Sequence, residues 1–262
     1  MKFGTRDGVL RQPWERLFDE AARLGFDGVE LNIGEEYADT MLWSADGRGK
    51  LRDLSGRSGA ELAAVCLGAM WGISLANPDP DVQEEAKKII RDSIKFCGKL
   101  GIEFILVPIT PFRGGDIPPE KAVQHWIAGL KPCAAVAEAH QVILAVENVG
   151  GGVCPSAERQ MEIMEGVDSP FVQAYYDFGN GLSLGNDPIE EIDLLGKARI
   201  AAVHAKAPGG TYLGEGDLNF EGVAAALRGI GYDGYIILET EPTDSPSEAA
   251  SRNLAFLKNL FA

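Results

Sequence analysis

The stretch that decides the fold is residues 172–206, VQAYYDFGNGLSLGNDPIEEIDLLGKARIAAVHAK. It contains two apolar runs of β-forming residues, with a short helical pattern at 189–195 between them. A strand, a crossover helix and a parallel strand form the unit from which α/β barrels are built, and such barrels place their chemistry where strands end. Each apolar run ends at or near a residue that can bind a metal, Asp177 in the first and His204 in the second.

The same alternation of short strand patterns and amphipathic helix patterns runs through the whole chain. Strands are expected at residues 2–5, 28–31, 61–66, 104–108, 143–147, 172–177, 200–206 and 235–240. Helices are expected at about residues 13–24, 50–58, 82–100, 119–140, 156–165, 189–195, 219–230 and 247–260. Eight such units predict an α/β protein with a (β/α)8 TIM-barrel fold, in a single domain of residues 1–262. A doubly wound open sheet is the alternative, but GTRDG at residues 4–8 lacks the GxGxxG fingerprint of that fold.

Composition and charge restrict the partners and the compartment. The formal net charge of -15 disfavours nucleic acid, because such binding relies on Lys and Arg neutralising phosphates. The N-terminal MKFGTRDG is not followed by an apolar run, and the chain nowhere contains roughly eighteen consecutive apolar residues, so neither a signal peptide nor a membrane span is expected. The four cysteines show no CxxC spacing. We therefore expect reduced thiols and a cytoplasmic protein.

Polar residues stand at the carboxyl ends of several expected strands, where the loops of a barrel gather. Glu30 follows this pattern on the second strand, and Glu147, Asp177, His204 and Glu239 follow it on strands five to eight. Neighbouring strands would then direct three carboxylates and one imidazole to one side of the barrel mouth. Oxygen-rich ligation with a single histidine suits Mn²⁺, Mg²⁺ or Co²⁺ better than a structural zinc site. The sequence predicts one divalent metal ion, which would be Mn²⁺, Mg²⁺ or Co²⁺.

Five motifs around these residues carry a family resemblance. They are ENVG at 147–150, YYDFGN at 175–180, VHAKA at 203–207, LGEGDLNF at 213–220 and GYDGYIILE at 231–239. Together they resemble the sugar phosphate isomerase/epimerase superfamily of xylose-isomerase-like barrels, and within it the ketose 3-epimerases. The resemblance implies that Glu147, Asp177, His204 and Glu239 bind one divalent metal, commonly Mn²⁺. It also implies that the two glutamates act as acid and base.

The implied chemistry explains why two glutamates are needed. Removing the proton beside a ketone leaves an enediolate, and a metal that chelates the carbonyl and neighbouring hydroxyl oxygens stabilises its charge. Inverting that carbon requires proton removal on one face and delivery on the other. Glu147 and Glu239 are the candidates for these two roles. The predicted function is a metal-dependent epimerase that inverts C3 of a ketose or ketose phosphate.

The sequence departs from the free-ketose branch of the family at two positions. Asn180 stands where that branch has a histidine, three residues after the metal-binding aspartate, and Gly210 stands where it has an arginine. These departures leave open which sugar is used and whether it is phosphorylated. The alternatives are an isomerase resembling hydroxypyruvate isomerases or an inosose-type dehydratase on the same metal site. A non-enzymatic sugar-binding barrel is not expected, because no metal ligand is lost.

Five further residues are candidates for substrate contact. Lys206 alternates with His204 along its strand, so both side chains should point to the same side. Asn180 either binds substrate or is only a left-handed turn residue. Trp71 would wall the sugar pocket or pack over the barrel rim, Glu30 would touch substrate or act as a capping group, and Arg6 ends the first strand. We expect a small sugar or sugar phosphate as the partner and a homo-oligomer, either a dimer or a tetramer.

Overall fold

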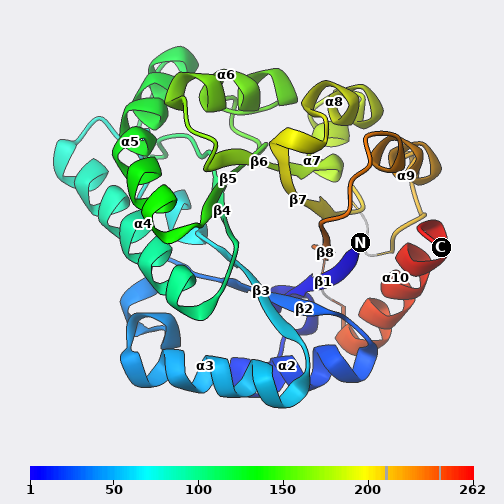
Figure 1. Cartoon of the computed structure of the whole chain (residues 1–262). Helices are drawn as coiled ribbons and strands as arrows, with labels where there is room; N and C mark the ends of the chain where they lie inside the picture. Colours follow the sequence, from blue (N-terminus) through cyan, green and yellow to red (C-terminus); the bar gives the residue numbers. More distant parts are fainter. Residues whose placement is uncertain (210–211, 242) are drawn as a thin grey trace.

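The computed structural model describes residues 1–209, 212–241 and 243–262, and its strands form one closed parallel barrel in sequence order. Figure 1 shows the helices arranged as a ring around these strands. The strands are β1 (Lys2–Arg6), β2 (Gly28–Asn32), β3 (Glu61–Cys66), β4 (Phe104–Pro108), β5 (Ile143–Glu147), β6 (Val172–Asp177), β7 (Ile200–Ala205) and β8 (Tyr235–Leu238). The predicted (β/α)8 barrel is therefore confirmed.

Long helices follow the strands and cover the outside of the barrel. They are α2 (Trp14–Leu24), α3 (Ala45–Ser58), α4 (Pro80–Leu100), α5 (Pro119–His140), α6 (Ala157–Val167), α8 (Pro188–Leu195), α9 (Phe220–Gly229) and α10 (Pro246–Leu260). Shorter elements lie in the connections: α1 (Asp7–Leu10), α7 (Phe178–Ser183), η1 (Tyr37–Asp39), η2 (Met41–Trp43), η3 (Gly68–Trp71) and η4 (Lys197–Arg199). The sequence patterns missed the short elements, because one turn of helix is too brief to show a period.

Local chemistry explains where the helices begin and end. Gly25 ends α2 in a left-handed conformation with φ of 92°, as its position after the helical pattern predicts. Asn219 caps α9 by accepting a hydrogen bond from the backbone N–H of Gly222. Helix α3 begins at Ala45 rather than at residue 50, because Ser44 caps it with its side-chain oxygen on the Gly47 N–H. Helix boundaries thus follow caps more closely than hydrophobic periodicity.

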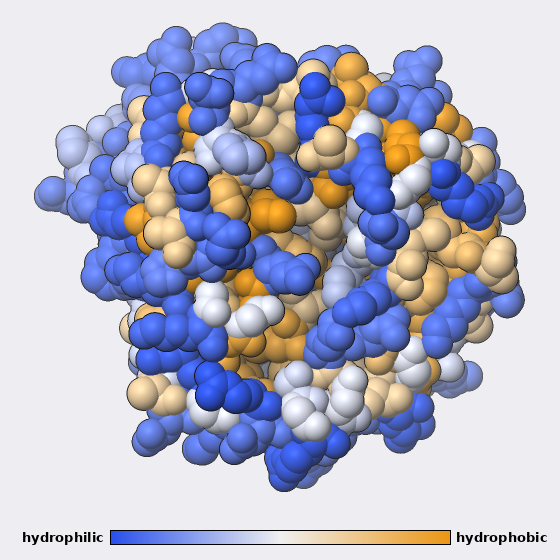
Figure 2. Space-filling view, viewed as in Figure 1, coloured by the Kyte–Doolittle hydropathy of each residue, from blue (hydrophilic) through white to orange (hydrophobic). Residues whose placement is uncertain are grey.

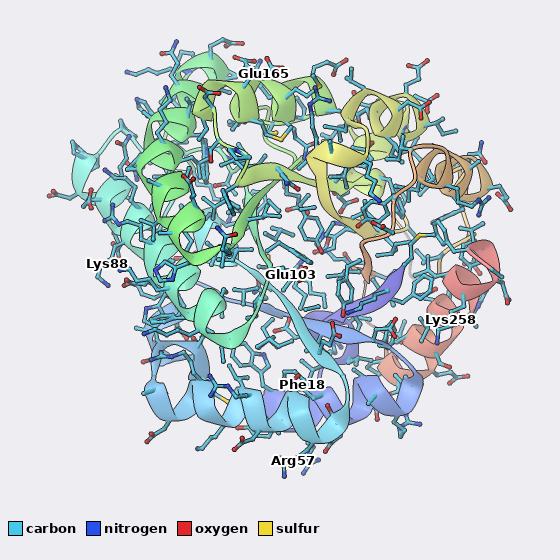
Figure 3. All side chains as sticks on the ribbon, viewed as in Figure 1. Phe18, Arg57, Lys88, Glu103, Glu165 and Lys258 are labelled. Carbon is cyan, nitrogen blue, oxygen red and sulfur yellow. The ribbon has the colours of Figure 1, made fainter. Side chains whose placement is uncertain are left out.

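The core lies in two layers, one between the barrel and the helices and one inside the barrel. Figure 3 shows Phe18 of α2 between its helix and the barrel, whereas Arg57, Lys88, Glu165 and Lys258 lie on the outer helices. The interior is filled mainly by small and aliphatic side chains, including Ala64, Leu106, Ala145, Ala202 and Ile237. These small residues leave room for larger polar groups from neighbouring strands.

The exterior is mainly hydrophilic, and the described helices include none with the length and apolar character that a membrane span requires. Figure 2 shows hydrophilic residues over most of the outer ring on one face. The four cysteines are buried and unpaired, as expected for reduced thiols.

The last two strands are shorter than expected. Strand β7 ends at Ala205 and β8 at Leu238, so Lys206 and Glu239 each follow their strand directly. The backbone N–H of Glu239 still donates to the carbonyl oxygen of Ala205 at 3.0 Å. This bond extends the parallel pairing and holds the Glu239 side chain at the barrel mouth.

Candidate metal centre

Four side chains from neighbouring strands converge at the carboxyl end of the barrel. Glu147 ends β5, Asp177 ends β6, His204 lies on β7, and Glu239 follows β8. Each offers a ligand atom, and these atoms all lie within 4.8 Å of one another. The four residues are buried or nearly so. The structure therefore brings together the ligand set that the sequence predicted, in an arrangement that can hold one metal ion.

His204 Nδ1 is surrounded by carboxylate oxygens. It lies 3.2 Å from Glu147 Oε1, 3.2 Å from Glu239 Oε2 and 3.9 Å from Asp177 Oδ2. Asp177 Oδ1 accepts the backbone N–H of Asn180 at 2.7 Å and so caps α7. Asp177 Oδ2 is buried but has no hydrogen-bond partner among the described residues.

The missing hydrogen bond at buried Asp177 Oδ2 allows a test of whether a metal fits here. Leaving such an atom without a partner is costly, and buried charges in proteins are normally paired or coordinate a metal. Asp177 Oδ2 lies 3.9 Å from His204 Nδ1, the nitrogen that oxygens of Glu147 and Glu239 also approach. Three carboxylates and one imidazole nitrogen are donors that suit a divalent cation such as Mn²⁺ or Mg²⁺. The residues present therefore fit the ion.

The electrostatics of the cluster reflect its concentrated negative charge. Burial by itself lowers the pKa of His204, but the neighbouring carboxylates of Glu30 and Glu147 raise it to about 9. Burial raises the pKa of Asp177, although the positive charges of Lys206 and His204 oppose this shift. A cation at the centre of the cluster would take over the compensation of charge that a protonated His204 otherwise supplies.

Two basic side chains flank Glu239. Lys206 Nζ lies 3.1 Å from Glu239 Oε2 and 3.7 Å from Asp177 Oδ2, so Lys206 points to the same side as His204, as predicted. Arg6 forms an ion pair with Glu239 and donates to Asn32 Oδ1 at 3.0 Å. A cleft of about 280 Å³ opens beside them, and its lining includes Arg6, Asp7, Asn32, Lys206 and Glu239. The cleft therefore reaches the cluster at Glu239.

Two other residues that the sequence suggested for substrate contact, Trp71 and Asn180, do not line this cleft. Trp71 lies in η3, half-buried, and the guanidinium of Arg113 stacks 4.6 Å from its ring centre. Asn180 lies in the first turn of α7 and is not in the left-handed conformation that one sequence reading gave it. Its side-chain amide donates to the Asn148 carbonyl oxygen at 3.0 Å. The prediction about Gly210 falls on a residue outside the described ranges.

Glu30 contacts the Nε2 side of His204 and does not line the cleft. Its side chain is completely buried on β2. Its Oε1 atom lies 3.1 Å from His204 Nε2, and its Oε2 atom accepts the hydroxyl of Tyr175 at 2.9 Å. Burial opposes ionisation of Glu30, but the charge of His204 and these hydrogen bonds lower its pKa. Glu30 therefore contacts His204, one of the four residues that could hold the metal ion.

Two residues of the site were not singled out from the sequence. Asn148 accepts the backbone N–H of Asp177 at 2.8 Å and donates to the Asp177 carbonyl oxygen at 2.9 Å, so it joins the ends of β5 and β6. Tyr175 reaches Glu30 from inside the barrel. A signal for Tyr175 existed, because it stands two residues before Asp177 and so points to the same face of its strand. Asn148 directly follows Glu147 in the ENVG motif.

Comparisons with known proteins agree with this geometry. The sequence profile of one protein family, described as xylose isomerase-like TIM barrel, matches residues 18–260. A protein of Escherichia coli K12 named "Putative L-ribulose-5-phosphate 3-epimerase SgbU" is 30% identical, with 89% of this chain and 86% of that protein covered. The L-ribulose-5-phosphate 3-epimerase UlaE of Salmonella paratyphi C is 28% identical, with 94% and 89% covered.

Solved structures share the fold. A D-psicose 3-epimerase of Clostridium cellulolyticum H10, solved with D-tagatose, superposes with a TM-score of 0.85 at 19% identity. The comparison covers 100% of this chain and 99% of that one. The barrel is thus closely similar along its whole length.

Proposed function

This chain belongs to the xylose isomerase-like TIM barrel family and is an enzyme of the carbohydrate epimerase and isomerase class, and we propose that it inverts C3 of a ketose phosphate or ketose in a metal-dependent reaction. The proposal extends the named activity of the L-ribulose-5-phosphate 3-epimerases to this chain. Its proposed ligands are Glu147, Asp177, His204 and Glu239.

One observation carries the proposal, which is that two glutamates approach the same centre from different strands. Glu147 comes from β5 and Glu239 follows β8, and each has an oxygen 3.2 Å from His204 Nδ1. Strands β6 and β7 lie between them in the barrel. Carboxylates from both sides of one site provide the acid and base that inversion of a carbon requires.

The side chains have distinct proposed tasks. A divalent ion held by the four ligands would polarise the ketone and its neighbouring hydroxyl and stabilise the enediolate charge. One of Glu147 and Glu239 removes the C3 proton from its face, and the other returns a proton to the opposite face. Lys206 and Arg6 hold Glu239 by ion pairs and line the cleft, so they are placed to contact substrate oxygens.

Several finer assignments belong to the same proposal. A phosphorylated ketose is favoured because the two curated relatives are named for L-ribulose 5-phosphate. The absence of the free-ketose histidine at Asn180 points the same way. We further propose Mn²⁺ as the ion, a dimer or tetramer as the assembly, one domain and the cytoplasm as the compartment, which the unpaired buried cysteines favour.

The test is to follow C3 proton exchange in deuterated water with added Mn²⁺, using a panel of ketoses and ketose phosphates. The wild-type enzyme should epimerise at least one of them with deuterium entering at C3. Glu239→Gln and Glu147→Gln should each lose epimerisation by about a hundred- to ten-thousand-fold, the usual cost of a positioned acid or base. Each variant should keep exchange from only one epimer, and the two variants should keep opposite ones.

Metal content of both variants must be measured, since both side chains are proposed ligands. Loss of exchange from both epimers at normal metal content would contradict the two-base scheme. An aldose–ketose isomerase or a dehydratase on the same site would then be the better description, and product analysis would separate them.

A further inference from the structure

A carboxylate inside the barrel contacts the Nε2 edge of His204, whereas the other three carboxylates approach Nδ1. Glu30 reaches from β2 across the interior to β6 and β7, where Oε1 lies 3.1 Å from His204 Nε2 and Oε2 accepts the Tyr175 hydroxyl at 2.9 Å. Its exposed fraction is 0%. The ring of Tyr175 also packs on the imidazole, with centroids 4.5 Å apart.

A buried carboxylate at this position calls for an explanation. Barrel interiors are dominated by branched aliphatic side chains, and taking a carboxylate out of water is costly unless its oxygens are paired. Here both oxygens are paired, by an imidazole N–H and a phenol hydroxyl. Glu30 also pairs in register with Arg6, whose positive charge contributes to its electrostatic environment.

Two irregularities in the barrel coincide with these residues. The pairing of β2 with β3 shifts register between Val29 and Glu30, and the pairing of β6 with β7 shifts between Ala174 and Tyr175. Bulges of this kind re-aim side chains and are frequent next to active sites. Both members of the Glu30–Tyr175 pair therefore lie at places where the backbone departs from regular pairing.

We propose that Glu30, supported by Tyr175, is a positioning residue of the metal centre that fixes the tautomer and orientation of His204. A carboxylate only accepts hydrogen bonds, so Nε2 carries a proton that it donates to Glu30. With a cation among the other three carboxylates, Nδ1 would carry no proton and its lone pair would face the ion. Partners of this kind raise metal affinity by presenting the ligand in its binding form. The inference rests on the metal site of the proposed function.

A direct role for Glu30 in substrate contact fits the structure less well. Both of its oxygens are engaged, it is fully buried, and the lining of the cleft includes Asn32 of the same strand but not Glu30. Glu30 acts on the reaction through His204.

The test compares Glu30→Gln with Glu191→Gln in the full-length protein. Glu191 is a matched control, because it is also buried and accepts a tyrosine hydroxyl, from Tyr176 at 2.6 Å, but it lies on α8 outside the barrel. Mn²⁺ affinity is measured by titration with electron paramagnetic resonance of the free ion. The ¹⁵N shifts of His204, recorded with diamagnetic Mg²⁺ because paramagnetic Mn²⁺ broadens nearby signals, report the tautomer, and only His125 and His140 need to be distinguished from it.

Glu30→Gln should raise the Kd for Mn²⁺ by about 10- to 100-fold, the usual cost of losing such a partner, while Glu191→Gln leaves it within about threefold of wild type. His204 in the Glu30 variant should show a mixture of tautomers. An unchanged Mn²⁺ Kd in Glu30→Gln, or an equal change in both variants, would overturn the inference. If Glu30→Gln does not fold, Tyr175→Phe replaces it, with a smaller rise of about three- to tenfold expected and an unchanged Kd contradicting the inference.

The outcome also separates this inference from the proposed function. Weak Mn²⁺ binding in Glu30→Gln alone supports the positioning role even if no tested ketose is epimerised. Failure of the wild-type protein to bind Mn²⁺ would overturn both.

Discussion

Two consecutive tyrosines of β6 make the same kind of contact on opposite sides of the barrel wall. Tyr175 points inward and donates to Glu30 at 2.9 Å, whereas Tyr176 points outward and donates to Glu191 at 2.6 Å. Both glutamates are buried. The strand thus carries one tyrosine–glutamate pair inside the barrel, the inner pair, and one among the helices, the outer pair.

The second oxygen of each glutamate distinguishes the two pairs. In the outer pair it accepts the backbone N–H of Ala157, which joins α8 to the start of α6. In the inner pair it contacts His204 Nε2. Burial raises the pKa of Glu191. Burial also opposes ionisation of Glu30, but the charge of His204, the hydrogen bonds to His204 and Tyr175 and the charge of Arg6 together outweigh it and lower the pKa of Glu30. The same residue types stabilise the fold in one place and position a metal ligand in the other.

Removing the metal should have the largest effect of the changes considered, and this effect should depend on the cluster beside the inner pair and not on the outer pair. Dialysis against a chelator should abolish epimerisation and lower the thermal midpoint, because an ion that binds only the native state stabilises it by mass action. The increase in melting temperature on adding Mn²⁺ should be the same in wild type and in Glu191→Gln, since the outer pair does not contact the cluster. Full activity in metal-free protein would contradict the site.

Replacing a histidine inside the barrel should weaken Mn²⁺ binding, whereas replacing one on an outer helix should not. This effect should be smaller than that of removing the metal. His204→Ala removes a proposed ligand and should weaken Mn²⁺ binding by roughly a hundredfold or more, exceeding the effect of losing its hydrogen-bond partner. His125 lies on α5, where it contacts Gln83 at 3.2 Å, so His125→Ala should leave the Mn²⁺ Kd unchanged. Equal losses in calorimetric titrations of the two variants would contradict the assignment of His204 as a ligand.

The outer pair should affect stability rather than activity. Tyr176→Phe removes one hydrogen bond to buried Glu191 and should lower the free energy of unfolding by about 1–3 kcal/mol. Urea denaturation measures this change, and the Mn²⁺ Kd of the same sample should stay at the wild-type value. A shift in Mn²⁺ affinity as large as that of Tyr175→Phe would show that the barrel wall does not separate the two functions.

Much of the barrel was predictable because its strands are buried on both faces. Runs such as ILAVE at 143–147 are almost continuously apolar, and the observed β5 has the predicted bounds. The short helices in the connections could not be predicted from hydrophobic periodicity. The helix α7 begins only because Asp177 caps it, and its six residues give no period.

The ligand set was predictable for a related reason. Parallel strands of a barrel end on the same side, so polar residues at the ends of strands five to eight had to meet there. Sequence order cannot give the depth of a side chain. Glu30 therefore looked equivalent to Glu147 at a strand end, although the structure places Glu30 at the Nε2 side of His204 and Glu147 at the Nδ1 side.

The sequence by itself determined the alternation of strands and helices, the closed parallel barrel and the four residues that gather at its mouth, because these follow from periodicity and strand direction. Only the tertiary structure decided that Asp177 Oδ2 finds no hydrogen bond within the part of the chain that the structure describes, that Arg6 and Lys206 flank Glu239, and that Tyr175 and Glu30 contact His204. These contacts join strands far apart in the chain. They depend on barrel closure and on two shifts of register, which no local pattern records.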